Sequence, residues 1–108
     1  MKVQEKYYNL LKKGIKTIEL RLYDDKRKKI NVGDEIIFEN LNNSNDSFIG
    51  IVEALYPAQN FMKLSEKIPI FKTGFQTQEE LLETMENFYP INVQTKTGVL
   101  GIEIKIKK

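Results

Sequence analysis

The segment 98–107 alternates between apolar and charged side chains, and this pattern constrains the fold more than any other feature of the chain. Its apolar members are Val99, Leu100, Ile102, Ile104 and Ile106. Successive side chains of a strand point to opposite faces, so the alternation predicts a strand with one face on a core. The segment 15–22 alternates in the same way. Its apolar members are Ile18, Leu20 and Leu22, and its polar members are Thr17, Glu19 and Arg21.

The rest of the chain adds two more strands and several helices. Apolar spacing, caps and breakers predict these elements, in chain order: a helix over 3–13 ending at Gly14, a charged turn over 23–29, a turn at 32–34, a strand over 35–39, a polar loop over 40–47, a strand from 48 to about 56, a short helix from Asn60 to Pro69, an irregular segment over 71–76, and an acidic helix from Thr77 to Tyr89. We therefore expect one α+β domain over residues 1–108. Its core should be a closed or partly closed barrel of about five or six mainly antiparallel strands with flanking helices.

Cysteine and histidine are both absent from the 108 residues. This excludes zinc fingers, thiol catalysis and histidine-based catalysis, so any catalytic group must be Lys, Glu, Asp, Tyr, Ser or Thr. No acidic cluster has metal-ligand spacing and no glycine-rich phosphate loop is present, so we expect neither a metal nor a cofactor. No stretch approaches the roughly 20 apolar residues that span a bilayer. A cytoplasmic protein with no membrane partner is the expectation.

The net charge of +2 is unevenly distributed along the chain. Residues 12–30 include eight basic and three acidic side chains, a net charge of +5. Residues 77–90 include four Glu and no basic side chain. The molecule should be polarised, with a basic region and an acidic helix.

The segment Gly14–Arg21 reads G-x-K-x-x-E-x-R, and Val32-Gly33-Asp34 follows a dozen residues later. This combination, with the closing strand from Gly98, resembles the ASCH family, named for homology to activating signal cointegrator 1, and in particular its small bacterial single-domain members. The resemblance implies a PUA-like β-barrel whose motif lines a cleft between barrel and helices. It also implies that the ligand is RNA or a nucleotide.

One bacterial branch of that family hydrolyses acetylated cytidine with a lysine, a threonine and a glutamate. Lys16 matches the lysine, but Glu19 stands where that branch has threonine and Gly74 stands where it has glutamate. The resemblance therefore does not carry the amidohydrolase activity to this chain. If the chain is a hydrolase, Lys16 and Glu19 are its candidate catalytic residues.

Lys16, Glu19 and Arg21 are the first candidates for a binding site. Lys16 starts on the apolar side of the predicted strand, so it should reach solvent at the barrel end or sit in a cleft beside a carboxylate. Glu19 and Arg21 are two residues apart and project together. They offer either a guanidinium fork for a phosphate or a base edge, or an ion pair on a solvated face.

Tyr23 and Phe75 are the aromatic residues placed best to stack on a base, whereas Tyr7 and Phe71 should lie in the core. The loop before the acidic helix adds two further candidates, Lys72 and Thr73. Either residue could border the family cleft or belong to an ordinary connector.

Three functions remain open on this sequence. The first is a binding module for RNA or a nucleotide, as a monomer or weak dimer. The second is a small hydrolase acting on a modified nucleoside, such as acetylated cytidine, or on RNA. The third is an adaptor that binds a protein through the acidic helix 78–88.

Overall fold

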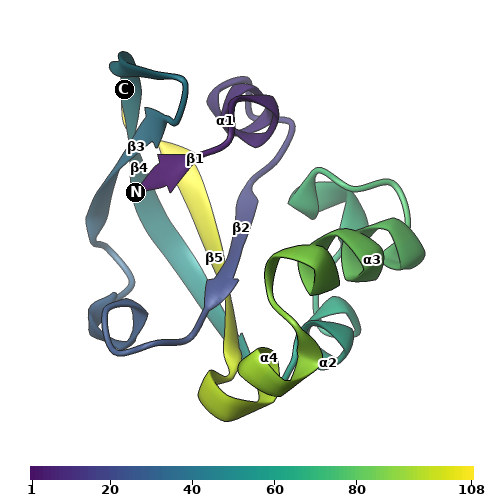
Figure 1. The fold of residues 1–108 in the computed structure, drawn as a ribbon. Coiled ribbons are helices and arrows are strands. Elements are labelled where there is room, and N and C mark those ends of the chain that lie inside the picture. Colours follow the sequence, from purple (N-terminus) through teal and green to yellow (C-terminus); the bar gives the residue numbers. More distant parts are fainter.

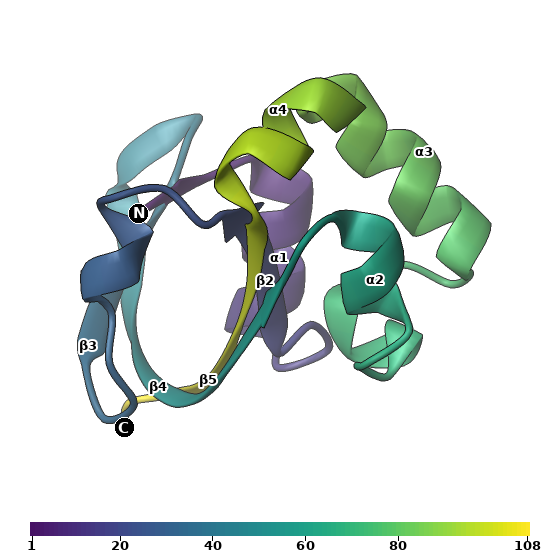
Figure 2. The ribbon, with the colours of Figure 1, turned by 90° about the horizontal axis from the view of Figure 1, so that it is seen from below.

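Five strands form one curled sheet with the order β1-β3-β4-β5-β2. The computed structural model describes all 108 residues. The strands are β1 (Lys2–Val3), β2 (Ile18–Leu22), β3 (Glu35–Asn40), β4 (Asn43–Ala58) and β5 (Val99–Ile106). Only β1 and β3 pair in parallel; the other pairs are antiparallel. The sheet closes halfway into a barrel (Figure 2), which confirms the expected α+β fold.

The long strand β4 is the spine of this half-barrel. Its first part pairs with β3, and its second part pairs with β5 from Gly50 to Ala58. The β4–β5 register shifts between Val52 and Ala54, and such a bulge bends a strand and increases its twist. One strand can therefore belong to both walls of the curl.

Four α-helices and two 3-10 turns complete the domain. They are α1 (Glu5–Lys12), η1 (Arg27–Lys29), α2 (Phe61–Ser65), η2 (Ile70–Thr73), α3 (Gln78–Phe88) and α4 (Ile91–Thr97). The expected caps are confirmed: the Asn60 side chain accepts from the Lys63 N–H at 2.8 Å, and the Thr77 side chain accepts from the Glu80 N–H at 3.1 Å. None of the helices has the length and apolar character that crossing a bilayer requires.

Two hydrophobic cores share the sheet. The inner core lies within the curl, where Tyr8 and Leu11 of α1 pack with residues of β3, β4 and β5 such as Phe38. The outer core lies between β2 and the helices, where Ile18 and Leu20 pack against Phe61, Leu64, Leu81 and Met85. In Figure 1 the helices α2, α3 and α4 gather on the side of the sheet beyond β2. Strand β2 is therefore covered on both faces.

Several predicted boundaries were wrong. Lys2–Val3 is a strand, because it pairs with β3, and the helix begins only at Glu5. The strand predicted over 15–22 begins at Ile18, and β4 begins at Asn43, inside the predicted polar loop.

One helix and one core residue were also mispredicted. Helix α4 was missed, since its residues are mostly polar and Pro90 was interpreted only as a stop; here Pro90 caps the start of a new helix. Phe71, expected in the core, is 73% exposed because its 3-10 turn points the ring outward. Tyr7, also expected in the core, is half-buried against both cores.

Candidate functional site

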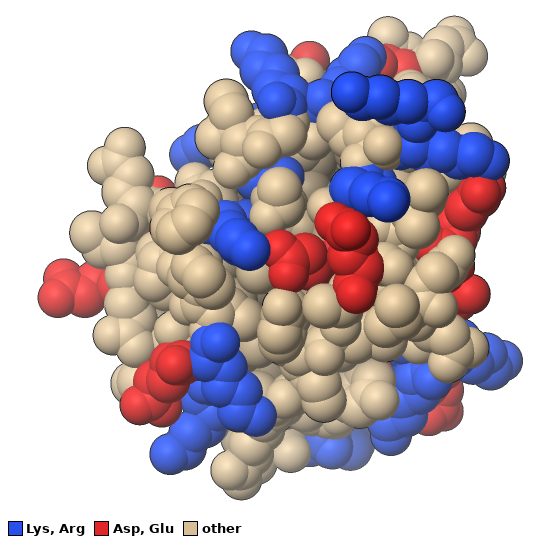
Figure 3. All heavy atoms as spheres, turned by 180° about the vertical axis from the view of Figure 1, so that it is seen from behind, with Lys and Arg blue, Asp and Glu red and all other residues tan.

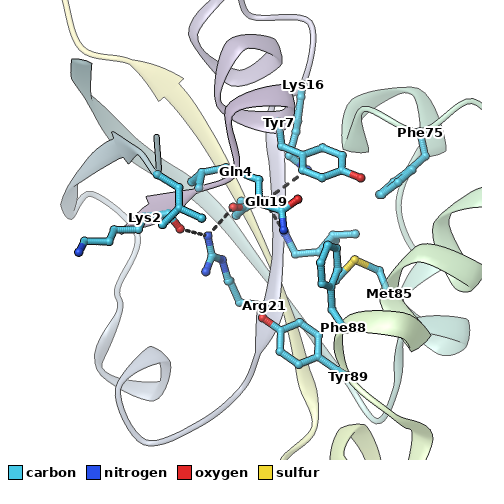
Figure 4. Close-up of a pocket in the computed structure, with 13 residues that line it drawn as sticks. Lys2, Gln4, Tyr7, Lys16, Glu19, Arg21, Phe75, Met85, Phe88 and Tyr89 are labelled. Carbon is cyan, nitrogen blue, oxygen red and sulfur yellow. Dashed lines mark hydrogen bonds and ion pairs between the residues drawn. The ribbon is translucent and has the colours of Figure 1, made fainter. Parts of the chain in front are cut away.

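The half-barrel leaves an opening between its two edge strands, β1 and β2, and a cavity of about 230 Å³ lies there. We call it the seam pocket (Figure 4). Lys2, Val3 and Gln4 line one side, and Glu19, Leu20 and Arg21 line the other. The remaining wall is mainly aromatic and comes from α1, from the segment before α3, and from α3 with the residue that follows it.

A buried array of three charges lies in the seam pocket. The Lys16 Nζ is 3.4 Å from Glu19 Oε1, and the Arg21 Nη2 is 2.9 Å from Glu19 Oε2. The exposed fractions of the Lys16, Glu19 and Arg21 side chains are 2%, 7% and 17%. The carboxylate therefore lies between two cations in surroundings from which water is largely excluded.

Backbone groups hold this array in place. The Lys16 ammonium donates to the Thr73 carbonyl at 2.7 Å, and the Leu20 N–H donates to Glu19 Oε1 at 3.2 Å. The Arg21 guanidinium donates to the Lys2 carbonyl at 2.7 Å, so it bridges the open seam from β2 to β1. Lys16 and Arg21 are thus tied to parts of the chain that are distant in sequence, while Glu19 is held by its neighbour Leu20.

The prediction that Glu19 and Arg21 project together is confirmed by their ion pair. Their cross-strand partners on β5, Ile102 and Leu100, belong to the inner core, so the polar face of β2 points into the curl rather than into solvent. Lys16 precedes the regular strand and therefore does not follow its alternation. Of the two places expected for Lys16, the structure shows the one beside a carboxylate.

Burial and charge act on the ionisation of the pair in different ways. Burial raises the pKa of the Glu19 carboxyl, but the charges of Lys16 and Arg21, with hydrogen bonds from Arg21 and Leu20, outweigh it, and the pKa lies below its ordinary value of 4.5. Burial lowers the pKa of the Lys16 ammonium from 10.5, and Glu19 opposes this effect. The Glu19 carboxyl is therefore ionised at neutral pH, whereas burial makes the Lys16 ammonium easier to deprotonate than an exposed lysine.

Aromatic side chains form the wall opposite the array. Phe88, at the end of α3, is 45% exposed, and its neighbour Tyr89 also lines the pocket. The Tyr7 ring stands 5.7 Å from the Phe75 ring, and the Lys16 Nζ is 5.8 Å from the centre of the Tyr7 ring. The pocket thus combines flat apolar surfaces with a charged floor, an arrangement suited to a planar polar ligand.

The model of the ASCH domain matches residues 1–105. The chain belongs to the ASCH domain family. Two solved structures resemble it closely. Hypothetical protein PH0355 is 36% identical with a TM-score of 0.86, over 99% of this chain and 96% of that one. Protein PF0455 from Pyrococcus furiosus is 31% identical with a TM-score of 0.73, over 100% of this chain and 99% of that one. No curated protein matches the chain.

Lys16, Glu19 and Arg21 converge, but not all the other predicted site residues join them. Phe75 lines the pocket as a buried core ring. Thr73 contributes its carbonyl to Lys16, while its hydroxyl donates to the Ile70 carbonyl. The part of each in ligand binding stays a prediction.

Lys72 and Tyr23 do not line the seam pocket. Lys72 pairs instead with Glu103 at 3.0 Å. Tyr23 packs against the inner core, and the Lys28 Nζ is 5.7 Å from the centre of its ring. Their predicted contacts with a ligand would require a second surface.

Sequence reasoning missed the pocket residues contributed by β1 and by the end of α3. Phe88 ends the apolar stripe of α3, and such a stripe does not by itself distinguish a pocket wall from core packing. Lys2 and Gln4 gave no signal, because only the pairing of β1 with β3 brings them to the seam.

The predicted basic region is partly neutralised. Lys12 pairs with Asp46 at 2.8 Å, and Arg27 pairs with Asp24 at 2.9 Å. On the face drawn in Figure 3, basic side chains gather at the upper edge, while elsewhere blue and red groups lie side by side. The charge of the surface does not form one continuous basic face there. No group of three or more Asp or Glu side chains could hold a metal ion.

Proposed function

We propose that this ASCH domain binds single-stranded RNA or a nucleotide and places one base in the seam pocket. The observation that carries the proposal is the buried array of Lys16, Glu19 and Arg21 facing an aromatic wall. Proteins that read unpaired bases combine stacking surfaces with fixed donors and acceptors for the base edge. The family membership supports the proposal, because ASCH domains are thought to bind RNA.

Folding alone gives little reason to keep this array. Removing two cations and a carboxylate from water costs several kcal/mol for each ion, and apolar side chains of similar volume often stabilise a fold as well or better. Perturbed charges that gather at a pocket are therefore candidates for function. The array also leaves part of its hydrogen-bonding capacity unused.

Contacts with phosphate should be few. Lys2 is exposed at the lip of the pocket, whereas Lys12 and Arg27 are already paired with carboxylates. Each phosphate contact adds roughly one unit or less to the salt dependence of binding. We expect a shallow salt dependence that reflects one or two contacts, in contrast to a protein that tracks along the backbone.

Fluorescence anisotropy with a labelled single-stranded RNA at two salt concentrations tests the proposal. The Lys16→Met, Arg21→Met double variant should lose binding by about a factor of ten or more, because each removed cation is within reach of the base. The matched control is Lys72→Met with Lys107→Met, which removes the same charge from residues outside the pocket. Circular dichroism establishes that both variants are folded. Equal affinity in the two variants, or no binding at low salt, would refute the proposal.

A hydrolase acting on a modified nucleoside is the second candidate. The lowered pKa of the buried Lys16 ammonium favours it, since a neutral amine can act as a base or nucleophile. Gly74, where the related hydrolases have glutamate, abuts this lysine: a Cβ on Gly74 would lie 3.2 Å from Lys16 Cδ. The position is thus near the array but offers no carboxylate. Turnover of acetylated cytidine that does not exceed that of Lys16→Met would remove this candidate.

A further inference from the structure

We infer that the seam pocket recognises the imide edge of uracil, so that its ligand class is uridine nucleotides or uridine-containing RNA. The inference rests on the proposed function and deepens it. It follows from the hydrogen-bonding groups that the array leaves open and from their order along the pocket floor.

Glu19 has one acceptor position left. A carboxylate has about four lone-pair positions. Oε1 faces the Leu20 N–H at 3.2 Å and the Lys16 ammonium at 3.4 Å. Oε2 accepts from Arg21 at 2.9 Å and makes no other hydrogen bond or ion pair with the protein. The carboxylate can therefore receive one hydrogen bond from a ligand, at Oε2.

The two cations have donors left on either side of that acceptor. Lys16 uses one N–H on the Thr73 carbonyl and directs a second at Glu19, so one of its three remains. Arg21 uses the two N–H groups of Nη2 on Lys2 and Glu19, and Nη1 and Nε have no partner. Because Lys16 lies against one carboxylate oxygen and Arg21 against the other, the open groups run donor, acceptor, donor.

Only uracil presents the complement of this order among the four RNA bases. Its Watson–Crick edge runs carbonyl, N–H, carbonyl, which matches an Arg–carboxylate–Lys row at every position. Guanine presents two adjacent donor groups and needs two acceptors. Cytosine and adenine place their donor at one end of the edge, so one cation would face no acceptor. Such sites are selective because a wrong base leaves a buried polar group without a partner, and this lowers its affinity.

The remaining pocket residues do not alter this order. Gln4 is exposed at the opposite side, and its amide can rotate to present either an acceptor or a donor. The aromatic rings stack on any base, and the hydroxyls of Tyr7 and Tyr89 can each donate or accept, so neither feature selects one base. The volume of about 230 Å³ lies below the ~300–1,000 Å³ typical of drug-sized ligands and suits a single small ring.

The test compares uridine, cytidine, adenosine and guanosine 5′-monophosphates with 3-methyluridine 5′-monophosphate, using chemical-shift titrations of the ¹⁵N-labelled protein. Methylation at N3 removes the N–H that would donate to Glu19 and keeps both carbonyls of the uracil ring. We expect uridine monophosphate to bind about tenfold or more tightly than each of the other four, as one mispaired base contact changes affinity by roughly this factor. The shifts should concentrate on β2 and the end of α3.

Glu19→Gln provides a second, independent measure. Glutamine can donate as well as accept, so the preference for uridine over cytidine monophosphate should fall to within about threefold. Glu103→Gln, at a carboxylate outside the seam pocket that also pairs with a lysine, should keep the full preference. If Glu19→Gln does not fold, the comparison with 3-methyluridine monophosphate on the unaltered protein still decides.

The outcomes separate the two claims. Equal affinity for the four natural nucleotides, or a preference for another base, overturns the uracil assignment and leaves base binding intact. Undiminished binding of 3-methyluridine monophosphate overturns the assignment too. Absence of binding by every nucleotide and by a single-stranded oligouridine overturns both the assignment and the proposed function.

Discussion

Glu19 is the residue on which the charge of the seam pocket depends. Its carboxylate is buried, and only the two cations beside it and two hydrogen bonds keep it ionised. A group whose pKa is lower in the folded state than in the unfolded chain stabilises the fold above its unfolded pKa. That contribution is lost as pH falls through the folded value. For Glu19 the loss sets in below about pH 4.5, the ordinary value.

We predict that Glu19→Gln lowers the free energy of unfolding at pH 7 by about 3 kcal/mol or more. It leaves the buried Lys16 without its counter-charge, and breaking a buried pair from one side typically has an effect of this size. The variant should also lose less stability than the wild type as pH falls from 5 to 3. Urea unfolding at several pH values measures both effects.

The control for that prediction is Glu35→Gln, which breaks the exposed pair with Lys107. An exposed pair is worth less than about 1 kcal/mol, so this variant should keep the stability and the acid response of the wild type. If Glu19→Gln and the wild type lose the same free energy of unfolding between pH 5 and pH 3, the role assigned to Glu19 is contradicted.

At the scale of residues, the sequence predicted which charges would meet but not where they would lie. Glu19 and Arg21 share a face because residues two apart in a strand point to the same side, and alternation along 18–22 is enough to predict this. Their burial follows from the curl of the sheet, which sets β5 and α1 against that face. Alternation carries no information about what covers a face, so the sequence left open whether the polar side of β2 forms a binding site or a solvated ion pair.

At the scale of elements, α4 depends on one buried side chain. Gln94 is fully buried, accepts from the Phe61 N–H at 3.0 Å and donates to the Tyr89 carbonyl at 2.7 Å. It thereby joins α4 to the start of α2 and to the residue that lines the seam pocket after α3. A seven-residue helix is too short to be stable alone, so these contacts fix its place.

We predict that Gln94→Leu destabilises the domain by about 2–4 kcal/mol. The change leaves a buried N–H and a buried carbonyl without partners, and each typically costs about 1–3 kcal/mol. Thr95→Ala is the matched control, since its exposed hydroxyl only donates to the Ile91 carbonyl within the helix. Thermal unfolding followed by circular dichroism compares them; similar midpoints for the two variants would contradict the prediction.

The close packing of β3, β4 and β5 around Gly50 gives a second prediction at this scale. A Cβ at Gly50 would lie 2.8 Å from Phe38 Cε2 and 2.9 Å from Ile104 Cδ1, both in the inner core. Gly50→Ala should therefore destabilise by about 1–3 kcal/mol through overpacking. Ile104→Val removes one of the two clashing atoms. Gly50→Ala should therefore lower the free energy of unfolding less in the Ile104→Val background than in the wild type. If urea unfolding shows that the free-energy changes of the two single variants simply add in the double variant, the contact between positions 50 and 104 is not the cause of the destabilisation.

The elements differed in how well the sequence predicted them, and the reason is physical. Strand β5 and helix α3 carry their own periodic apolar pattern, so they were predicted. Strand β1 has two residues, and helix α4 has mostly polar ones; both exist because of partners distant in the sequence. The same long-range pairing brings β1 to the seam, so part of the pocket could not be predicted from local pattern.

At the scale of the whole molecule, the two cores lie on opposite faces of one sheet. Ile18 and Leu20 belong to the outer core, while their neighbour β5 contributes Leu100 and Ile102 to the inner one. Neither core can lose its packing without exposing a strand that the other needs. Single domains of this size usually unfold in one cooperative transition, and the shared sheet gives a structural reason to expect it here.

Leu81→Ala tests this coupling from the outer core. The side chain is fully buried between α3 and the sheet, so its truncation should lower the free energy of unfolding by about 2–5 kcal/mol. If the two cores unfold together, the free energy of opening of the inner-core amides should fall by the same amount, although Leu81 belongs only to the outer core. Hydrogen exchange of the slowest amides in β3 and β4 measures the inner core, while far-UV circular dichroism measures the whole chain. A helical layer that melts first, leaving exchange in β3 and β4 unchanged, would show that the half-barrel folds independently of α2, α3 and α4.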